Sequence, residues 1–490
     1  MLKSISLKNY KCFEKLKVDD KEEMEIAPLT VLCGVNSSGK SSIINSLLML
    51  KQSYESNSTS NTMKINGTYI KSGTFEDISK DKMKQPISFD VSYELNKPPQ
   101  YNKSKQKISK SDVTAFKTLS KIYPSYYNIS KFMIKSHIIV KYEKEASQIK
   151  NNILDEQLIE LDIYSSDNKL ATTSIHLQHI QASQYLIEIK NIPNGDNKNL
   201  IPSVVLKGCT CYFENFNLIN AYATNITPPG TIVDGILANI YLIFRMNGLQ
   251  YKSLHYLTPL RVYPQRNYII DDESENIGIG GEYTPHIMFE YSKTKINGFL
   301  PPNNDKFSFS TEYDLFSNFI NAWMNYLNFG NYTLKKSFET IKLDISNYNI
   351  SNVGFGISQV LPILVTGLTQ KQKETLLLEQ PEIHLHPKAQ MCMADFLVSM
   401  AISEKGVIVE THSDHIINRI VRRMMENDLI NKKIKIYFVD QDNSGVSSIE
   451  NIIVDPVRGV LTENENFFTQ FASETEKIVR VGFTNKLKEQ

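Results

Sequence analysis

The chain contains 490 residues, 41% of them hydrophobic and 22% charged, and this length and composition suggest two to four domain-sized units of a soluble globular protein. Its formal net charge of +1 excludes a generally basic protein that coats nucleic acid, although local basic patches are compatible with it. The five scattered cysteines argue against a disulfide framework and favour a cytoplasmic location, and no apolar run reaches the roughly 20 residues of a membrane span.

The first predicted elements are strands followed by a glycine-rich loop. Residues 2–18 predict two strands around Asn9–Phe13, and the apolar run Leu29–Cys33 predicts a buried strand. The next residues, Gly34–Ser41, match the phosphate-loop pattern G-x-x-x-x-G-K-[ST], and apolar residues at helical spacing follow over 42–50. Strand, loop and helix together predict an anion cradle, because backbone N–H groups and the positive end of the helix face the phosphates.

The phosphate loop assigns roles to individual residues. Gly34 and Gly39 permit a backbone path that a Cβ would obstruct. Lys40 reaches the β- and γ-phosphates of a nucleotide, and the Ser41 hydroxyl ligates Mg²⁺. We therefore expect the chain to bind ATP together with Mg²⁺. The residues expected to hold the nucleotide in this loop are Gly34, Asn36, Ser37, Ser38, Gly39, Lys40, Ser41 and Ser42.

A region of alternating strands follows the loop. From 52 to 85 the chain is polar and irregular, and we expect Ser53–Asn61 to form a mobile loop. Residues 87–95 alternate strictly between apolar and polar side chains, which predicts a half-buried strand. Similar patterns occur at 136–142, 157–164, 184–190 and 203–213. Turn residues separate these strands, so they predict an antiparallel sheet rather than another βαβ unit.

Two features of this region have alternative interpretations. Residues 101–131 are rich in Lys, Ser, Asn and Tyr, which suits either a nucleic-acid-tracking arm with stacking tyrosines or a solvated helix or loop. We favour the solvated segment. Cys209 and Cys211 are too closely spaced for a usual zinc knuckle and are alternate residues of a predicted strand, so metal binding there is disfavoured.

The next part of the chain contains two predicted helices, at 231–248 and 312–328. Between them, Arg261 and Arg266 lie in a proline-containing loop. Two arginines in a restrained loop suit an anion, and a structural salt bridge is an equally good interpretation. Pro301–Asp305 predicts a surface turn and a subdomain boundary.

The C-terminal third returns to α/β alternation. A glycine turn at Asn352–Gln359 leads into a helix that ends near Leu368. The apolar strand Thr375–Glu379 precedes a helix that begins at Pro387. The remaining predicted elements are a strand at 407–410, a helix with Asp414 as its N-cap, strands near 434–440 and 447–454 around a turn at Asp440–Gly445, and a helix at about 465–480.

Three further motifs fit the chemistry of the phosphate loop. Glu379 ends an apolar strand, where an oxygen ligand for Mg²⁺ is held rigidly. His412 follows the next strand and reaches the γ-phosphate. Gly354, Gly356 and Ser358 lie at a helix N-terminus, a second phosphate-binding end that serves a nucleotide held by another subunit.

In this order, the motifs resemble those of the ABC-type ATPase heads of RecF, SMC and OLD proteins. Leu378–Pro387 is similar to the extended Walker B and D-loop of the OLD-like subgroup, and Glu410–His415 is similar to its switch-histidine motif. Leu7–Phe13 is similar to the opening strand of such heads, in which the basic residue, here Lys11, approaches the nucleotide. The resemblance is greatest to the standalone branch of OLD-like ATPases, relatives of which occur in bacterial anti-phage systems such as Septu.

The resemblance implies a fold and an assembly. The fold is α/β, an ABC-type P-loop ATPase head with an antiparallel β subdomain and a helical insertion. The assembly is a homodimer or higher homo-oligomer beside an effector protein, a nuclease or toxin, with nucleic acid as an open alternative and no membrane. The expected domains are an N-terminal lobe with the phosphate loop (1–85), an antiparallel and insertion region (86–250), a C-terminal lobe with signature, Walker B and switch histidine (251–430), and C-terminal strands and helix (431–490).

Two departures from the family pattern concern catalysis. Gln380 occupies the place where many such heads carry a catalytic glutamate, so either it orients water and turnover is slow, or Glu382 replaces the base. The signature is Gly354-x-Gly356-x-Ser358-Gln359 rather than Leu-Ser-Gly-Gly-Gln, which leaves open the group that touches the γ-phosphate of the partner subunit. The expected catalytic residues are Glu379, Gln380, Glu382 and His412.

Other chemistries are disfavoured. About 80 residues follow the switch histidine, too few for the TOPRIM nuclease domain of the family's nuclease-bearing members, so no intrinsic nuclease is expected. Asp440 and Asp442 are better explained as a hairpin turn than as metal ligands. Zinc ligation by His384, His386 and His415 is disfavoured, because the D-loop accounts for the first two. Two functions therefore remain: an ATP-driven conformational switch, or a nucleotide-bound scaffold that hardly hydrolyses.

Overall fold

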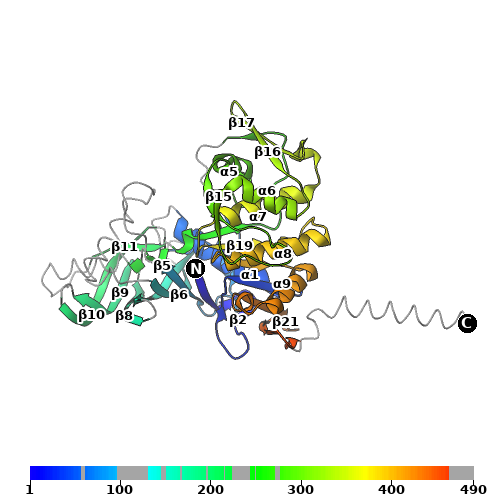
Figure 1. Cartoon of the computed structure of the whole chain (residues 1–490). Coiled ribbons are helices and arrows are strands. Elements are labelled where there is room, and N and C mark those ends of the chain that lie inside the picture. The colour runs from blue at the N-terminus through cyan, green and yellow to red at the C-terminus, as the bar shows by residue number, and fades with distance from the viewer. Residues whose placement is uncertain are drawn as a thin grey trace, which may run out of the picture. The chain divides into compact units, whose positions relative to one another are not determined.

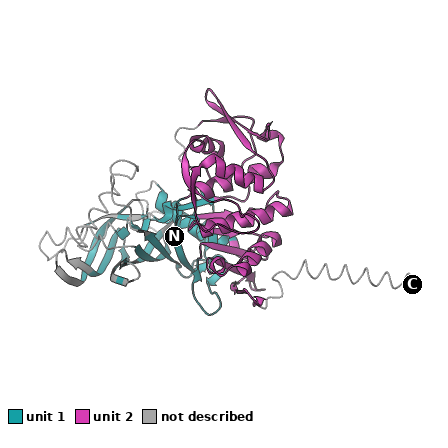
Figure 2. Ribbon diagram, in the orientation of Figure 1, with its two compact units in different colours: residues 1–26, 41–256, 371–375 teal, residues 27–40, 257–370, 376–490 magenta. Residues whose placement is uncertain are grey.

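The structure is a computed structural model of the chain. It describes residues 1–56, 61–96, 131–144, 150–165, 168–181, 183–194, 197–214, 216–222, 243–244, 246–248, 250–270 and 276–462. The chain divides into two compact units, which Figure 2 colours separately. The first unit comprises residues 1–26, 41–256 and 371–375, and the second comprises residues 27–40, 257–370 and 376–490.

The first unit contains a ten-stranded antiparallel sheet in the order β11-β10-β9-β8-β7-β6-β5-β1-β2, with β3 paired to β1. Figure 1 shows β8, β9 and β10 side by side. On β5, Phe89 and Val91 point into the core, whereas Asp90 and Ser92 face the other side, as the alternation requires. The strands are β1 (Leu2–Tyr10), β2 (Phe13–Lys15), β3 (Met24–Glu25), β5 (Ile87–Asn96), β6 (Lys131–Lys144), β7 (Lys150–Ser165), β8 (Asn168–Gln181), β9 (Gln184–Asn194), β10 (Asn197–Glu214) and β11 (Asn217–Tyr222).

Most of these strands and their antiparallel pairing confirm the sequence predictions. The strands predicted at 87–95, 136–142, 157–164, 184–190 and 203–213 correspond to β5, β6, β7, β9 and β10. Strands β8 and β11 were not predicted. The core face of β8 carries buried Thr173 and His179 beside Ile175 and Leu177, so its apolar alternation is weaker than that of β5.

The first long helix, α1 (Lys40–Glu55), extends further than predicted. The prediction of a mobile loop from Ser53 was wrong for Ser53–Glu55, and residues 57–60 lie outside the described part. Polar side chains at this end of α1 are buried and bonded: the Ser53 hydroxyl donates to the Met49 carbonyl oxygen at 2.8 Å, and the Gln52 amide donates to that of Lys64. The polar residues at this end of α1 therefore belong to the helix, because their side chains are buried and hydrogen-bonded. A short helix, α2 (Phe75–Ile78), follows.

The second unit is organised by a sheet whose strands follow the order β19-β20-β4-β21-β22. Strands β20 and β21 run parallel to β4, and β22 runs antiparallel to β21. Strands β19, β20 and most of β4 are buried along their length, which explains their apolar sequences. The parallel strands bring their carboxyl ends to one edge. The strands are β4 (Leu29–Gly34), β19 (Thr375–Glu379), β20 (Gly406–Glu410), β21 (Ile434–Gln441) and β22 (Ser447–Ile452). A further strand, β12 (Leu254–Leu257), belongs mostly to the first unit.

The helices of the second unit surround a hydrophobic core in which Trp323 of α6 meets Phe396 of α8, with ring centroids 4.9 Å apart. The helix predicted at 312–328 begins only at Phe316, because Glu312–Leu315 pairs as β15 with β14 (Lys295–Gly298). The helices predicted after the glycine turn and from Pro387 are confirmed. The helices are α5 (Thr284–Tyr291), α6 (Phe316–Tyr326), the 3₁₀ turn Ile350–Asn352, α7 (Phe355–Thr369), α8 (Pro387–Ile402), α9 (Asp414–Glu426) and α10 (Asp428–Asn431).

The N-cap of α9 is Ser413, and the prediction of Asp414 was wrong. The Ser413 hydroxyl oxygen accepts from the Ile416 backbone N–H at 3.1 Å, the bond that defines a cap. Asp414 is instead the first helical residue, where a carboxylate is still favourable beside the positive end of the helix.

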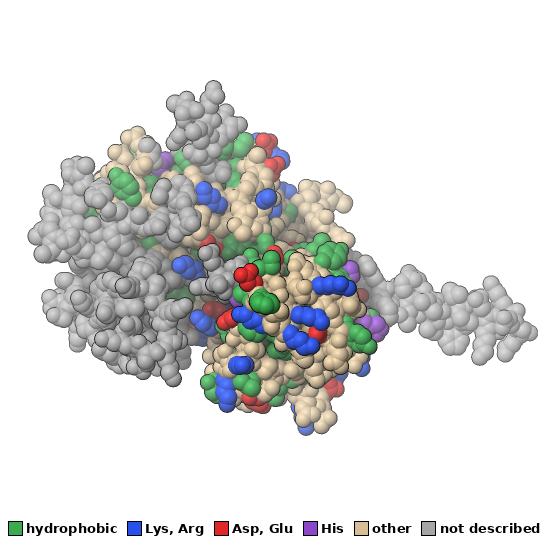
Figure 3. Space-filling model, turned by 90° about the horizontal axis from the view of Figure 1, so that it is seen from above, with side chains coloured by type: hydrophobic (Ala, Val, Ile, Leu, Met, Phe, Trp, Pro, Cys, Tyr) green, Lys and Arg blue, Asp and Glu red, His purple; other side chains and the backbone are tan. Residues whose placement is uncertain are grey.

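Small sheets complete the second unit and were not predicted. They are β13 (Tyr268–Ile269), β16 (Tyr332–Ser337), β17 (Thr340–Ile345) and β18 (Tyr348–Asn349) in one sheet, and β23 (Val454–Asp455) with β24 (Gly459–Val460) in another. Figure 3 looks down on the face of Figure 1 that carries β16 and β17, where lysine and arginine side chains lie among hydrophobic ones.

Some predictions fall outside the described residues: the lysine-rich segment 101–130, most of the helix at 231–248 and the helix at 465–480. In the described part of the chain, no helix is long and apolar enough to cross a membrane. The predicted α/β class with a separate antiparallel sheet is confirmed.

Candidate nucleotide-binding site

The phosphate loop starts where β4 ends beside β21. Gly34 pairs with Val439 of β21. Its φ is +132°, and a Cβ there would lie 2.0 Å from the Val439 carbonyl oxygen, so a larger residue would displace one of the strands. Gly39, with φ of +106°, also adopts a conformation that favours glycine. The local backbone therefore requires both motif glycines.

Lys40 is the first residue of α1 and is only 3% exposed. Its Nζ donates to the carbonyl oxygens of Gly34, at 3.1 Å, and Val35, and lies 3.5 Å from the Ser38 hydroxyl. Burial lowers the pKa of Lys40, and the nearby carboxylate of Glu410 acts in the opposite direction. The Lys40 ammonium group thus donates its hydrogen bonds to oxygen atoms of the loop, whereas the motif predicts that it binds phosphate oxygens of a nucleotide.

Strand β22 holds the base of the loop. The hydroxyl of Ser447, the first residue of β22, donates to the Ser38 carbonyl oxygen at 2.6 Å, and both residues are buried. Val35, Asn36 and Ser37 are exposed. The loop is therefore anchored at its base and open at its middle. The role of Ser447 could not be predicted from the sequence, because nothing in its local pattern indicates a contact with a residue 409 positions away.

Glutamates end the two strands that precede β4 in the sheet. Glu379 ends β19 and Glu410 ends β20, and they are 9% and 4% exposed. The backbone N–H of Gln380 donates to the Glu410 carbonyl oxygen at 2.8 Å and joins the two strand ends. The strand order β19-β20-β4 therefore brings the predicted magnesium ligand and the phosphate loop to one edge of the sheet.

Gln380 has an unusual backbone conformation with φ of +44°. Its side chain is partly exposed and makes no hydrogen bond to any residue that the structure describes. Strained backbone at a strand end is frequent in functional sites. The amide is thus available to a ligand or a water molecule.

Glu382 binds the segment that carries His412. Its Oε2 accepts from the Thr411 hydroxyl and its Oε1 accepts from the backbone N–H of His412, each at 2.8 Å. Burial raises the pKa of Glu382, while these hydrogen bonds and the charge of Arg261 oppose that rise. Partial burial and the positive charge of Lys40 both lower the pKa of His412.

Arg261, one of two arginines in the predicted anion loop, is 3% exposed. Its Nη2 donates to the Glu379 carbonyl oxygen at 2.8 Å, and its backbone N–H donates to Oε1 of Gln359 at 3.2 Å. Arg266 is exposed, and within the described residues its side chain makes no hydrogen bond that would connect it with Glu379 or Gln359. The two arginines thus occupy different environments, which the sequence did not distinguish.

The glycine signature lies at the N-terminus of α7 and packs on the D-loop. Gly354 is the N-cap, and a Cβ there would meet nothing within 4 Å. A Cβ on Gly356 would lie 2.6 Å from the His384 carbonyl oxygen, and the Phe355 ring meets the His384 ring with centroids 4.7 Å apart. The Ser358 hydroxyl donates to the Phe355 carbonyl oxygen at 2.7 Å.

A comparison with protein families finds a match to the AAA ATPase domain over residues 1–417, most of the chain. The chain belongs to the AAA ATPase domain family. This AAA ATPase domain includes every motif described above. No curated protein matches the chain.

Solved structures similar to this AAA ATPase domain include SMC heads. An SMC head bound to the C-terminal winged-helix domain of ScpA has 11% identity and a TM-score of 0.40, with 93% of this chain and 98% of that chain covered. An SMC head domain from Thermotoga maritima has 12% identity and a TM-score of 0.35, with 92% and 99% covered. A Pyrococcus furiosus SMC head with an extended coiled coil, bound to the C-terminal domain of ScpA, has 10% identity and a TM-score of 0.36, with 92% and 96% covered. Likenesses this weak support no conclusion about activity or assembly.

The second unit of the AAA ATPase domain brings together most of the predicted site residues. It contains Gly34–Lys40, Gly354–Ser358, Glu379–Glu382 and His412. Ser41 and Ser42 follow Lys40 directly in the first turn of α1. Lys11 belongs to the first unit, in the turn between β1 and β2, with its Nζ 5.7 Å from the Tyr10 ring centroid. Its approach to the nucleotide stays a prediction.

Two of the residues considered as metal ligands in the sequence, His386 and Asp442, make structural hydrogen bonds within the described part of the chain. No group of three or more His, Cys, Asp or Glu side chains is arranged there to hold a metal ion. The ring nitrogen Nδ1 of His386 accepts from the Lys388 backbone N–H and caps α8. Asp442 Oδ1 accepts from the backbone N–H groups of Ser444 and Val446, which confirms the hairpin turn.

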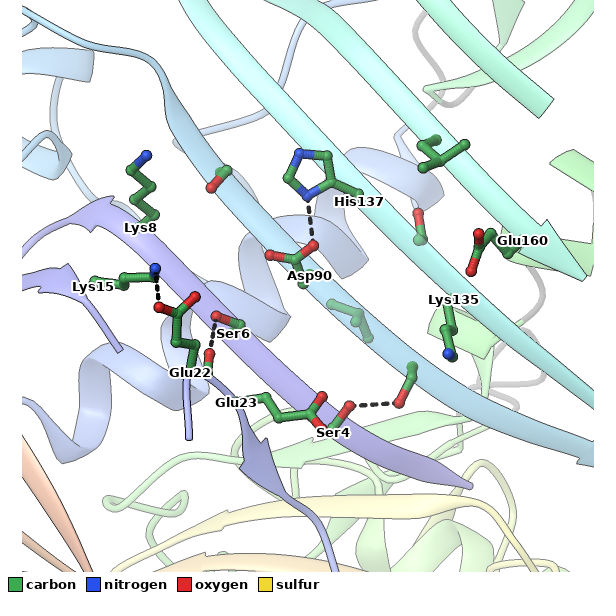
Figure 4. Close-up of a pocket in the computed structure, with 15 residues that line it drawn as sticks. Ser4, Ser6, Lys8, Lys15, Glu22, Glu23, Asp90, Lys135, His137 and Glu160 are labelled. Carbon is green, nitrogen blue, oxygen red and sulfur yellow. Dashed lines mark hydrogen bonds and ion pairs between the residues drawn. The ribbon is translucent and has the colours of Figure 1, made fainter. Parts of the chain in front are cut away.

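A separate polar groove of about 650 Å³ lies on the exposed face of the ten-stranded sheet, within the first unit (Figure 4). Serines form much of its floor, and ion pairs form its walls: His137 Nδ1 lies 2.5 Å from Asp90 Oδ1, and Lys15 pairs with Glu22. Hydrogen bonding to Asp90 raises the pKa of His137. The phosphate-loop residues Gly34–Lys40 belong to the second unit, and the other charged residues that line the groove are Lys8, Glu23, Lys135 and Glu160.

Proposed function

We propose that this AAA ATPase domain binds ATP at Gly34–Ser42 and hydrolyses it slowly. The observation that supports this most is the convergence, in one unit, of the buried Lys40, the strand-end Glu379 and the His412 segment. Lys40 exchanges its loop carbonyl partners for the β- and γ-phosphates. His412, whose lowered pKa favours the neutral imidazole, reaches toward the γ-phosphate as a hydrogen-bonding group.

The residues present also fit Mg²⁺. The Ser41 hydroxyl and the buried Glu379 carboxylate are oxygen donors of the kind that Mg²⁺ prefers, and one or two protein ligands beside substrate phosphates are usual. When bound, the ion neutralises charge on the β- and γ-phosphates. The chain's own contribution is to hold Glu379 rigidly through the Arg261 bond to its carbonyl oxygen.

Slow turnover follows from Gln380. An amide cannot take a proton from the attacking water, although its carbonyl oxygen can orient that water. Glu382 accepts one hydrogen bond at each carboxylate oxygen, from the Thr411 hydroxyl and from the His412 backbone N–H. Its role in the proposed mechanism is to position His412 rather than to act as the general base.

Two biological roles are consistent with a slow ATPase. In the first, two copies enclose the nucleotide and act as a conformational switch for an effector, in cytoplasmic anti-phage defence or a DNA transaction, as the OLD-like and Septu-like resemblance implies. In the second, the nucleotide-bound dimer is a scaffold with little or no hydrolysis. Negligible ATP turnover by the native chain would favour the second role, because the amide of Gln380 cannot act as a general base.

Replacing Lys40 by alanine tests the nucleotide site. The change removes a charge-assisted contact of about 1.5–3 kcal/mol, so ATP affinity or turnover should fall at least tenfold, as measured with a fluorescent nucleotide and by phosphate release. The control is Lys342→Ala, since Lys342 is a surface lysine whose side chain is 46% exposed, on β17 of the same unit. Unchanged binding and hydrolysis in Lys40→Ala would refute the proposal.

A further inference from the structure

We propose that Arg261 is a positioning residue that couples the Gly354–Gln359 segment to the catalytic strand end at Glu379. The inference rests on the proposed ATPase function. It adds a connection between the glycine signature at the start of α7 and the acidic end of β19. All the residues involved belong to the second unit.

The contacts of Arg261 join segments that are far apart in sequence. Its guanidinium donates to the carbonyl oxygen of Glu379, 118 positions away. Its backbone N–H donates to the Gln359 amide oxygen, 98 positions away, and its carbonyl oxygen lies 3.4 Å from the Gln359 Nε2. Gln359 is fully buried, so this amide has no role on the surface and is fixed to the arginine loop.

A second contact joins the same two elements. The ring of Tyr263, two residues after Arg261, meets the Phe355 ring with centroids 4.8 Å apart, and the Phe355 ring in turn meets His384 of the D-loop. The arginine loop therefore lies against the first turn of α7, and a displacement of that turn is transmitted to Arg261.

The connection continues to His412. The positive charge of Arg261 acts on the Glu382 carboxylate, which holds both the Thr411 hydroxyl and the His412 backbone. A ligand that moves the glycine turn is thereby linked to the carbonyl of Glu379 and to the segment of His412. An arginine suits this place because its planar guanidinium stays charged when buried and donates in fixed directions.

The experiment compares Arg261→Gln and Arg261→Lys with the native chain and with Arg266→Gln. Arg266 lies five residues further along the same loop and is exposed, so its variant controls for loss of charge in the loop. We expect Arg261→Gln to lower kcat at least tenfold while KM and the Kd for ATP change less than threefold, since the phosphate loop is intact. Arg261→Lys should recover part of kcat, and Arg266→Gln should match the native chain.

A double-mutant cycle distinguishes coupling from two independent losses. Gln359→Leu alone should also lower kcat. In the double variant Arg261→Gln/Gln359→Leu, the fold-decrease in kcat should be smaller than the product of the two single fold-decreases. Native kcat in Arg261→Gln, or strictly multiplicative effects, would overturn the inference. If KM, Kd and melting temperature all deteriorate together in Arg261→Gln and Arg261→Lys, the role is structural and the inference also fails. A native chain that neither binds nor hydrolyses ATP would instead refute the proposed function.

Discussion

At the scale of single residues, the acidic strand end separates the roles of three neighbours. Glu379 is buried and fixed through its carbonyl by Arg261, Gln380 is strained and has an available side chain, and Glu382 is bound to the histidine segment. Three polar residues within four positions of one motif therefore have three different environments. Sequence alone left Gln380 and Glu382 as alternatives for the water-activating group, and the hydrogen bonds of Glu382 favour Gln380 as the residue that faces water.

Substitutions at Gln380 and Glu382 test this assignment. Gln380→Glu supplies a carboxylate that accepts a proton, so single-turnover hydrolysis should accelerate at least tenfold, with the 10²–10⁴-fold that general bases typically contribute as the upper range. Glu382→Gln keeps one acceptor oxygen and should lower kcat only severalfold, with ATP binding unchanged. If Gln380→Glu is no faster and Glu382→Gln abolishes hydrolysis, Glu382 is the base.

At the scale of elements, patterns that depend on a short stretch of sequence were predicted well. The phosphate loop, β19, β20, α7 and α8 all have local signals: glycines, apolar runs, or a proline that starts a helix. Strand β8 has buried Thr173 and His179 in place of apolar residues, and the two-residue strands are too short to show a period. The roles of Ser447 and Gln359 depend on contacts across the unit and leave no local trace.

Helix α9 offers an element-scale prediction, because its start was predicted one residue too late. Ser413 caps the helix through the Ile416 N–H and also donates to Gln390 Oε1 on α8 at 2.5 Å. Ser413→Ala should lower the free energy of unfolding by about 0.5–2 kcal/mol. Asp414→Ala, the matched control, loses only a helix-dipole interaction of about 0.3–1 kcal/mol.

Urea denaturation of the two variants measures both values. Equal losses, or a larger loss for Asp414→Ala, would contradict the assignment of the cap. Because His412 directly precedes Ser413, the same variants also show how far the histidine segment depends on the start of α9. A lower turnover number in Ser413→Ala, measured under conditions in which the variant is still fully folded, would indicate such dependence.

At the scale of the whole molecule, the second unit collects its site from three separate stretches of chain, 27–40, 257–370 and 376–490. The order of the motifs indicated that these stretches meet, since parallel strands bring their carboxyl ends to one edge. The sequence did not indicate how they are locked together. Arg261 and Ser447 perform that task, because Arg261 joins 257–370 to 376–490 and Ser447 joins 376–490 to 27–40, while Gln359 holds Arg261 within its own stretch.

The helix N-terminus at Gly354 leads to a prediction about assembly. Backbone N–H groups in the first turn of α7 suit a phosphate, and we propose that this phosphate belongs to a nucleotide held by a second copy of the chain. Gly354 has φ of −57°, and a Cβ there meets nothing within 4 Å, so its own chain tolerates a side chain. Gly354→Gln should therefore fold and bind ATP as the native chain does, yet block the approach of the second copy.

Light scattering with ATP and Mg²⁺ measures the outcome. The native chain should form a homodimer, Gly354→Gln should remain monomeric with at least tenfold slower turnover, and Gly354→Ala should behave much as the native chain. Gly356→Ala is not an equivalent test, because its Cβ would meet the His384 carbonyl oxygen of the same chain at 2.6 Å. A Gly354→Gln variant that dimerises and hydrolyses ATP as the native chain does would show that the signature turn contacts no second copy, and the slow ATPase would then act as a monomer.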